Sequence, residues 1–422
     1  MPEESTPSQP SQPAGLGDAA AGAASKSPPG PLSGLRVLEL ASILAGPLTG
    51  QFLAELGAEV IKVENPATGG DPTRGWWLRG EDHAAEVSAY FSCANWGKQS
   101  LALDLASPAG LAVIDALVAR SDIVLQSFKP GDDRKLGLDA ERLLTLNPKL
   151  IVGRISAYGS ADARPGFDAI IQAESGFTFL NGTPDGPPVK MPVALVDLLA
   201  AHQLKEAILL ALLAQARGDA TGRVLDVSLL DAAIASLANQ ASNYLVAGQV
   251  PQRMGSEHPN IVPYGAVFRL SDGAELVLAV GTDRQWLALA TALGLEALGA
   301  DPRFVTNQGR VQHRVELGAA LDTAFAVLDR ATADKLLRAS RVPFGFVNDM
   351  REVFAQPQAE PLLLEGGGLQ GVRSFVAQGL FRALPLLPPP AFNADGAAVL
   401  RRVLGYDDER LTALRTAGVW PG

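Results

Sequence analysis

The sequence predicts an α/β fold, with a doubly wound parallel sheet in a large domain and a smaller α+β domain. Short apolar runs typical of buried strands alternate with stretches in which apolar residues recur at helical spacing. Glycines and prolines stand at the ends of the predicted helices. After about residue 264 the pattern changes to a β-hairpin followed by helices. The alternation predicts the sheet, and the change predicts the second domain.

The first unit of the predicted sheet is a strand over 36–40, a helix over 48–56 and a strand over 58–64. Gly57 is expected to end the helix, and the connection should be right-handed. Ala45, Gly46 and Pro47 form the loop between strand and helix, at the strand end where open α/β sheets bind ligands. A plain βα turn explains these three residues equally well. The loop lacks G-x-G-x-x-G, so no nicotinamide or flavin site is predicted.

The alternation then continues along the chain. Further strands are expected over 101–105, 123–125, 150–156 and 224–227, and helices over 108–120, 139–146 and 229–246. The second domain should contain strands over 268–270 and 275–280 and helices over 285–293 and 315–325. The segment 366–368, Gly-Gly-Gly between short apolar runs, is read as a hairpin turn, and a last helix lies near 407–417.

The predicted domain boundaries follow from these elements, since 422 residues exceed one ordinary core. Residues 1–33 are rich in Pro, Ser, Ala and Gly and should form a disordered tail. Residues 34–225 and 340–422 form the large Rossmann-like domain, and residues 226–339 form a linker helix and the small domain.

Composition excludes several classes of protein. The net charge of −10 argues against a nucleic-acid partner, which would need clustered Lys and Arg. Cys93 is the single cysteine, so no intramolecular disulfide can form and a reducing, cytoplasmic compartment is expected. The longest apolar run, residues 207–214, is too short to span a bilayer, so no membrane partner is expected.

Asp197 is the most conspicuous charged residue, because it follows an apolar run and precedes a long apolar helix. Leu204, Ile208 and Leu212 continue the helical spacing after it. This position is typical of a helix N-cap, where free N–H groups and the helix dipole favour the ionised carboxylate. From the residues alone, Asp197 is either a capping group or a catalytic carboxylate.

Many ordered blocks of the chain resemble the class III CoA-transferases of the CaiB/BaiF type, relatives of formyl-CoA transferase, carnitine CoA-transferase and α-methylacyl-CoA racemase. The matching blocks are residues 32–40, 44–47, 56–64, 71–76, 95–104, 128–131, 164–168, 193–197, 226–231 and 258–260. The resemblance implies two domains joined by two linkers into a ring, and two rings interlocked as a homodimer. It also implies that Asp197 is the nucleophile.

That family chemistry is CoA transfer from an acyl-CoA to a carboxylic acid. It proceeds through an aspartyl mixed anhydride and an aspartyl–CoA thioester, and neither a metal nor a redox cofactor is needed. The resemblance places CoA contacts at seven positions: Ala45, Arg74, Lys98, Leu103, Phe128, Lys135 and Arg164. It places further active-site positions at Leu44, Ala45, Gly46, Asp168, Gln172 and His258. His258, a lone loop histidine, is as readily structural.

Departures from the family pattern narrow the substrate. Leu44 stands where formyl-CoA transferase has a glutamine, Asn65 where an arginine is often found, and the four-glycine loop is missing from 248–263. These changes argue against a formyl or oxalate enzyme. Arg74, Arg253 and His258 would suit a second carboxylate, so a dicarboxylyl-CoA such as succinyl-CoA is expected.

The alternative activity is that of the racemase relatives, in which a His and an Asp exchange a proton at the α-carbon. Asp168 matches the racemase aspartate. However, the partner histidine is expected within 128–167, and the four histidines are His83, His202, His258 and His313. Transfer is therefore preferred over racemisation. A non-catalytic CoA-binding protein is preferred still less, because Asp197 is present.

Overall fold

The computed structural model describes residues 30–83, 86–376 and 383–422. The predicted disordered tail therefore lies mostly outside the described residues. Its last residues are folded, however: Leu32 is buried in the core and its N–H donates to the carbonyl of Leu56 at 2.9 Å. The boundary at residue 33 was thus placed too late.

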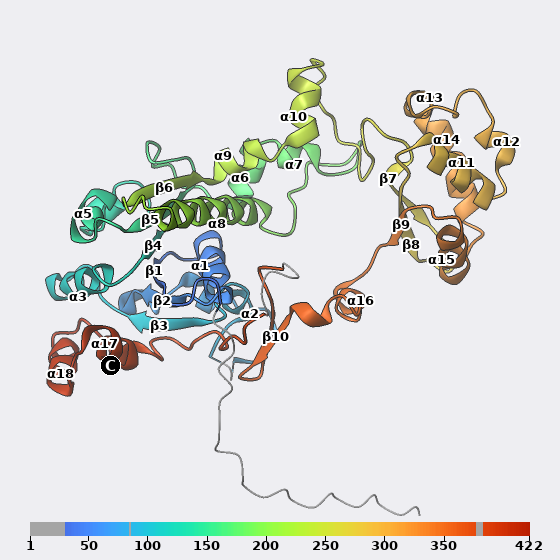
Figure 1. Ribbon diagram of the computed structural model, residues 1–422. Coiled ribbons are helices and arrows are strands. Elements are labelled where there is room, and N and C mark those ends of the chain that lie inside the picture. The colour runs from blue at the N-terminus through green and yellow to red at the C-terminus, as the bar shows by residue number, and fades with distance from the viewer. Residues whose placement is uncertain (1–29, 84–85, 377–382) are drawn as a thin grey trace, which may run out of the picture.

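The large domain is built on a six-stranded parallel sheet, whose strand order β3-β2-β1-β4-β5-β6 is that of the Rossmann fold (Figure 1). Its strands are β1 (Arg36–Leu40), β2 (Glu59–Glu64), β3 (Lys98–Ala102), β4 (Ile123–Gln126), β5 (Ile151–Ser156) and β6 (Arg223–Ser228). The predicted doubly wound sheet is confirmed. The third strand begins at Lys98, three residues earlier than expected. A lysine usually indicates an exposed position, but Lys98 is buried within this strand.

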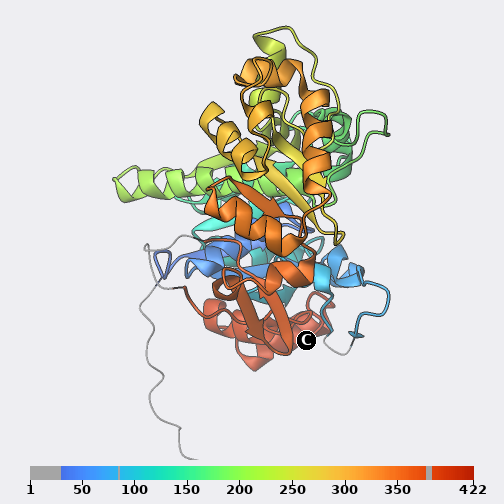
Figure 2. The ribbon, with the colours of Figure 1, turned by 90° about the vertical axis from the view of Figure 1, so that its right-hand side faces the viewer.

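Helices cover both faces of this sheet, because successive side chains of a strand point to opposite sides. Val37 packs with α1 (Ala45–Glu55), α8 (Leu195–Ala216) and α9 (Leu229–Ala235) in one core. Its neighbour Leu38 packs in a second core with α3 (Pro108–Val118), α5 (Ala140–Leu146), α17 (Gly396–Leu404) and α18 (Asp408–Thr416). The C-terminal helices (red) thus belong to the large domain, and Figure 2 shows them on the side away from the small domain.

The small domain has its own core around an antiparallel sheet of β7 (Tyr264–Arg269), β8 (Glu275–Ala279) and β9 (Phe344–Phe346). Its helices are α11 (Asp283–Ala292), α12 (Glu296–Gly299), α13 (Asn307–Gln312), α14 (Arg314–Phe325) and α15 (Arg330–Ala339). Because β9 pairs with β8, the boundary at residue 339 is corrected to beyond Phe346. The other boundary also moves, since α9 packs in the large domain.

Two separate stretches join the domains, one containing α10 (Ala238–Leu245) and the other α16 (Met350–Phe354) (Figure 1). The predicted helix over 229–246 is interrupted between α9 and α10, where Ala238 has a φ of +47°. The predicted turn at 366–368 joins the hairpin strands β10 (Leu363–Gly366) and β11 (Leu369–Val372). The remaining elements are α2 (Ala89–Ser92), α4 (Asp132–Lys135), α6 (Asp168–Glu174), α7 (Phe177–Leu180) and the 3-10 turns Pro66–Thr68, Pro72–Gly75 and Glu360–Leu362.

Candidate active site

The carboxyl edge of the parallel sheet brings together most of the predicted site residues. Strand order reverses between β1 and β4, and ligands of open α/β sheets bind at such a point. At this edge a hydrogen bond connects the loops that follow β1 and β4: the N–H of Ser42 donates to Oγ of Ser127 at 3.0 Å. Helix α8 precedes β6 and runs against the strand direction, so its first turn lies at the same edge.

Asp197 is the third residue of α8 and is half-buried. The expected N-cap role is wrong, because the helix begins two residues earlier and Ala194 occupies the N-cap without a side-chain bond. Within the described part of the chain, no protein group donates a hydrogen bond to the Asp197 carboxylate. The carboxylate is therefore held by its helix but is free to react.

The protonation of Asp197 also differs from expectation. The pKa of Asp197 is raised to about 7, chiefly by burial and additionally by like-charge repulsion from the nearby Asp168 carboxylate. We expected the helix dipole to favour the ionised form. The loss of water around a half-buried carboxylate outweighs that dipole here.

Asp168 and Gln172 connect α6 to the first turn of α8. Asp168 is buried, and its Oδ1 accepts the N–H of Val196 at 2.9 Å. Its Oδ2 accepts Nε2 of Gln172 at 2.8 Å. Gln172 in turn accepts the N–H of Met191 at 2.7 Å. The capping function expected of Asp197 is therefore performed by Asp168, a residue from another helix.

Leu44, Ala45 and Gly46 lie beside the first turn of α8. Leu44 is buried in a small cluster that includes Leu48 and Ala201, with Ala194 and Leu198 packed against it. Ala45 and Gly46 are the first two residues of α1, and no acceptor for their N–H groups occurs among the described residues. A Cβ on Gly46 would lie 2.4 Å from Cβ of Ala41, so only glycine fits there. The loop thus offers two backbone donors at the edge where Asp197 stands.

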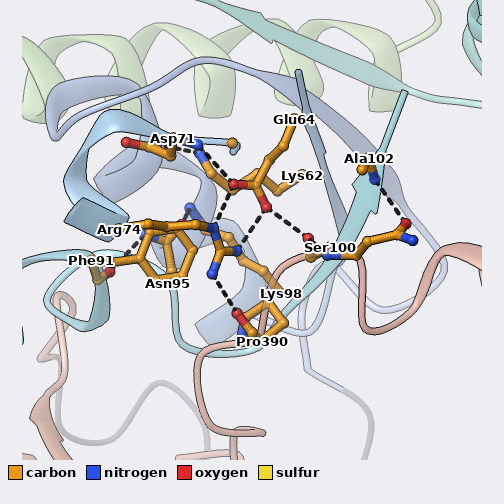
Figure 3. A network of polar contacts seen from close by, with 12 residues as sticks. Lys62, Glu64, Asp71, Arg74, Phe91, Asn95, Lys98, Ser100, Ala102 and Pro390 are labelled. Carbon is orange, nitrogen blue, oxygen red and sulfur yellow. Dashed lines mark hydrogen bonds and ion pairs between the residues drawn. The ribbon is translucent and has the colours of Figure 1, made fainter. Parts of the chain in front are cut away.

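Two of the predicted CoA contacts, Lys98 and Arg74, are buried in a network of ion pairs (Figure 3). Nζ of Lys98 donates to Glu39 at 2.9 Å, to the carbonyl of Pro47 at 2.8 Å and to Oδ1 of Asn95 at 2.9 Å. An ammonium group has three donors, and all are used.

Arg74 is similarly occupied. Its Nε and Nη2 each bind a Glu64 carboxylate oxygen at 2.7 Å, and its Nη1 binds the carbonyl of Pro390 at 3.1 Å. The guanidinium also lies 3.8 Å from the ring centroid of Phe91. In this structure, Lys98 and Arg74 are buried cations paired with protein carboxylates, which suits a structural role better than contact with a CoA phosphate.

The remaining predicted CoA contacts are one buried residue, one half-buried residue and two exposed cations. Leu103 is fully buried in the core on the α3 face, so its side chain does not face a ligand. Phe128 is half-buried and borders a cleft at the ends of β4, β5 and β6. Lys135 and Arg164 are 77% and 58% exposed, and each is paired with a nearby aspartate, Asp132 and Asp162.

His258 lies on the small-domain side of the molecule. Its Nδ1 accepts the N–H of Asn260 at 3.1 Å, and its ring meets Tyr264 edge to face. No contact in the described chain connects His258 to Asp197. The structure thus brings together Leu44, Ala45, Gly46, Asp168 and Gln172 around Asp197, but not His258.

Comparison with known proteins decides the family. The sequence profile of CoA-transferase family III matches residues 32–364. The chain belongs to CoA-transferase family III. It is 42% identical to the succinate–glutarate CoA-transferase of Agrobacterium fabrum over 336 residues, covering 78% of this chain and 83% of that protein.

Other members of the family support the same assignment over nearly the full length. The chain is 33% identical to the human succinyl-CoA:glutarate CoA-transferase over 399 residues, which are 92% of this chain and 90% of that protein. The crystal structure of a CaiB/BaiF family protein from Brucella suis matches with a TM-score of 0.78 at 38% identity. That match covers 89% of this chain and 100% of the other.

Tyr90 lies near Asp197 and Asp168, and the sequence did not predict this. It is half-buried in α2, and its ring meets Trp76 edge to face at 4.8 Å. Burial raises the pKa of Tyr90 to about 12, and Cys93, Asp197 and Asp168 contribute to the rise. The phenol is therefore a neutral donor close to both carboxylates. The sequence around Tyr90 shows no helical periodicity, because α2 is only one turn long.

In residues 30–83, 86–376 and 383–422, no group of three or more His, Cys, Asp or Glu side chains could hold a metal ion. Within the same residues, no helix combines the length and apolarity that crossing a bilayer requires.

Proposed function

We propose that this family III enzyme transfers CoA from a dicarboxylyl-CoA such as succinyl-CoA to a second carboxylic acid, with Asp197 as nucleophile. The half-buried Asp197 carboxylate carries the proposal, because it makes no hydrogen bond with any described residue. The loop that packs against the first turn of its helix also carries two backbone N–H groups, of Ala45 and Gly46, without an acceptor among the described residues. The substrate class is supported by relatives at 42% and 33% identity whose names specify succinate or succinyl-CoA and glutarate.

The proposed reaction begins when a carboxylate oxygen of Asp197 attacks the thioester carbonyl of the acyl-CoA. The carbon–sulfur bond breaks, and a mixed anhydride and the CoA thiolate result. The thiolate then attacks the carbonyl carbon of Asp197, so the donor acid leaves as a carboxylate and an aspartyl–CoA thioester remains. The acceptor carboxylate repeats the two steps in reverse order. No proton is gained or lost overall.

The surroundings of Asp197 suit these steps. The N–H groups of Ala45 and Gly46 are candidate donors to the tetrahedral oxyanion. The neutral Tyr90 phenol is a further donor, and Trp76 beside it limits access of water to the anhydride. For CoA itself, we propose the cleft that Phe128 borders. Lys135 and Arg164 do not line this cleft, and we propose these exposed cations as phosphate contacts outside it.

We further propose that the enzyme is an interlocked homodimer. Large apolar side chains remain exposed on the connecting stretches and on α8: Leu210 is 66%, Leu245 77% and Val246 86% exposed. Apolar surface of this kind is typical of a protein interface. We place the dimer in the cytoplasm, where its single cysteine would stay reduced.

The direct test is a product analysis by mass spectrometry. Succinyl-CoA, acetyl-CoA and a long-chain acyl-CoA are each incubated with glutarate, other dicarboxylic acids and monocarboxylic acids. We expect a new acyl-CoA chiefly from the dicarboxylic pairs, and none with Asp197→Ala. Equal transfer from all three donors would contradict the substrate class, and transfer by Asp197→Ala would contradict the nucleophile.

The alternative racemase activity is tested in deuterated water with a chiral 2-methylacyl-CoA. Both oxygens of Asp168 already accept hydrogen bonds, from Val196 and Gln172, which suits a positioning group better than a base. We therefore expect no deuterium at the α-carbon. Exchange that disappears in Asp168→Asn and persists in Asp197→Ala would establish racemisation instead.

A further inference from the structure

The loop between β1 and α1 has an unusual backbone conformation. Ile43 has a φ of +73°, in the left-handed region that β-branched residues rarely adopt. Such a conformation costs free energy and persists only where surrounding groups hold it. The groups that hold it are therefore part of how the site is built.

A buried ion cluster holds this loop at three points. Both Oδ atoms of Asp71 accept the N–H of Ile43, at 3.1 and 3.3 Å. Nζ of Lys62 donates to the carbonyl of Ala41 at 2.8 Å. Nζ of Lys98 donates to the carbonyl of Pro47 at 2.8 Å. The loop is thus bound before, at and after the strained residue.

The cluster is itself tightly paired and buried, and Figure 3 shows the contact between Lys62 and Asp71. Lys62 pairs with Glu39 at 3.0 Å and with Asp71 at 2.9 Å, and all three side chains are at most 1% exposed. Lys98 pairs with the same Glu39 at 2.8 Å. Apolar residues of similar volume usually stabilise a fold as well as such buried ion pairs do. The cluster is therefore better explained by what it positions than by stability.

The strained loop contacts the helix that carries Asp197. Leu44 is buried against Ala194 and Leu198 in one apolar cluster, and Ile43 packs in the same cluster. Ala194 precedes and Leu198 follows Asp197 in α8. A displacement of the loop would therefore move the first turn of α8.

We propose that Asp71 is a positioning residue for catalysis: it fixes Ile43, and through Ile43 and Leu44 it fixes the first turn of α8 and Asp197. The inference rests on the proposed function of Asp197. Asp71 does not touch the substrate. It acts through one buried carboxylate that ties Ile43 to Lys62, with Thr73 donating to the same group at 2.7 Å.

The test is the Asp71→Asn variant, in which an amide NH₂ replaces an oxygen that accepts from Ile43 and pairs with Lys62. We expect kcat to fall by about tenfold or more, since a small misplacement of a reacting group costs that much. The KM for acyl-CoA should change by less than about threefold. The rate at which hydroxylamine traps Asp197 should fall with kcat.

The matched control is Asp115→Asn, the same substitution at another carboxylate of the large domain; it breaks the ion pair with Arg142 but contacts neither Asp71 nor any of residues 41–47. It should lower the melting temperature yet keep kcat within about threefold of wild type. An unchanged kcat in Asp71→Asn, or equal losses of kcat in the two variants, would overturn the proposal.

Should Asp71→Asn not fold, Ile43→Gly tests the same route, since Ile43 is only half-buried and glycine adopts positive φ without strain. Glycine keeps the N–H that Asp71 accepts but removes the Ile43 side chain from the cluster with Ala194 and Leu198, so kcat should fall, and an unchanged kcat would overturn the proposal. Asp197→Ala is measured beside them. Activity of that variant would reject the proposed nucleophile, whereas an inactive Asp197→Ala with a fully active Asp71→Asn or Ile43→Gly would reject only the positioning.

Discussion

The Asp168 carboxylate accepts the backbone N–H of Val196, the residue directly before Asp197, at 2.9 Å. One buried carboxylate thus caps the helix of the other and lies close enough to raise its pKa. The arrangement keeps Asp197 in place and makes its ionisation sensitive to pH near neutrality.

The pH dependence of transfer follows from this pair. Only ionised Asp197 is a nucleophile, so kcat/KM should fall about tenfold per pH unit below about 7. The falling part of the pH profile below about pH 7 is its acid limb. Asp168→Asn removes the like charge and should move this acid limb to lower pH by roughly one unit. Asp185→Asn, an exposed carboxylate on the loop before α8, serves as control and should leave the limb in place. An unmoved limb in Asp168→Asn would contradict the coupling.

The stability of the fold should fall as pH rises towards 7, whereas kcat/KM should rise. The pKa of Asp197 rises from 3.8 to about 7 on folding, so its contribution is favourable only below about pH 4 and is lost as pH rises through 7. Asp197→Asn removes this cost, and at pH 8 it should stabilise the protein by on the order of 2 kcal/mol. Thermal unfolding at pH 4 and pH 8 measures it. An equal effect at both values would mean that Asp197 is not shifted.

Binding of CoA should depend on the exposed cations. Lys135→Glu should raise the KM for acyl-CoA about fivefold, with kcat little changed, because an exposed charge contact contributes only modestly to binding. The effect should shrink at high salt because exposed charges are screened. Lys335→Glu, an exposed lysine on α15 of the small domain, makes the same charge change elsewhere. Equal effects of the two variants would remove Lys135 from the CoA site.

An interlocked dimer should not separate without unfolding. Denaturation followed by circular dichroism and light scattering should show loss of helix and loss of dimer in one transition, whose midpoint rises with protein concentration. A folded monomer at low concentration would contradict the proposed assembly.

The sequence predicted the sheet and its helices well because buried strands and amphipathic helices have short-range patterns. The start of α8 was missed because its cap is Asp168, 28 residues away in sequence from Val196. The resemblance places Lys98 at a CoA contact, and no local pattern indicates its buried partner Glu39, which lies 59 residues away in sequence. A charge inside an apolar strand, as in Glu39 and Lys62, was the available signal for a buried ion cluster. The position of β9 depends on pairing with β8, which no local pattern specifies.

The central claim is that Asp197 carries CoA during the reaction. The direct measurement is peptide mass spectrometry after the enzyme is incubated with succinyl-CoA and then with hydroxylamine, which displaces CoA from an aspartyl thioester and leaves a hydroxamate. We expect the hydroxamate at Asp197, dependent on succinyl-CoA and unaffected by omitting the acceptor acid. CoA transfer that proceeds while Asp197 stays unmodified, or a hydroxamate at another carboxylate, would contradict the account.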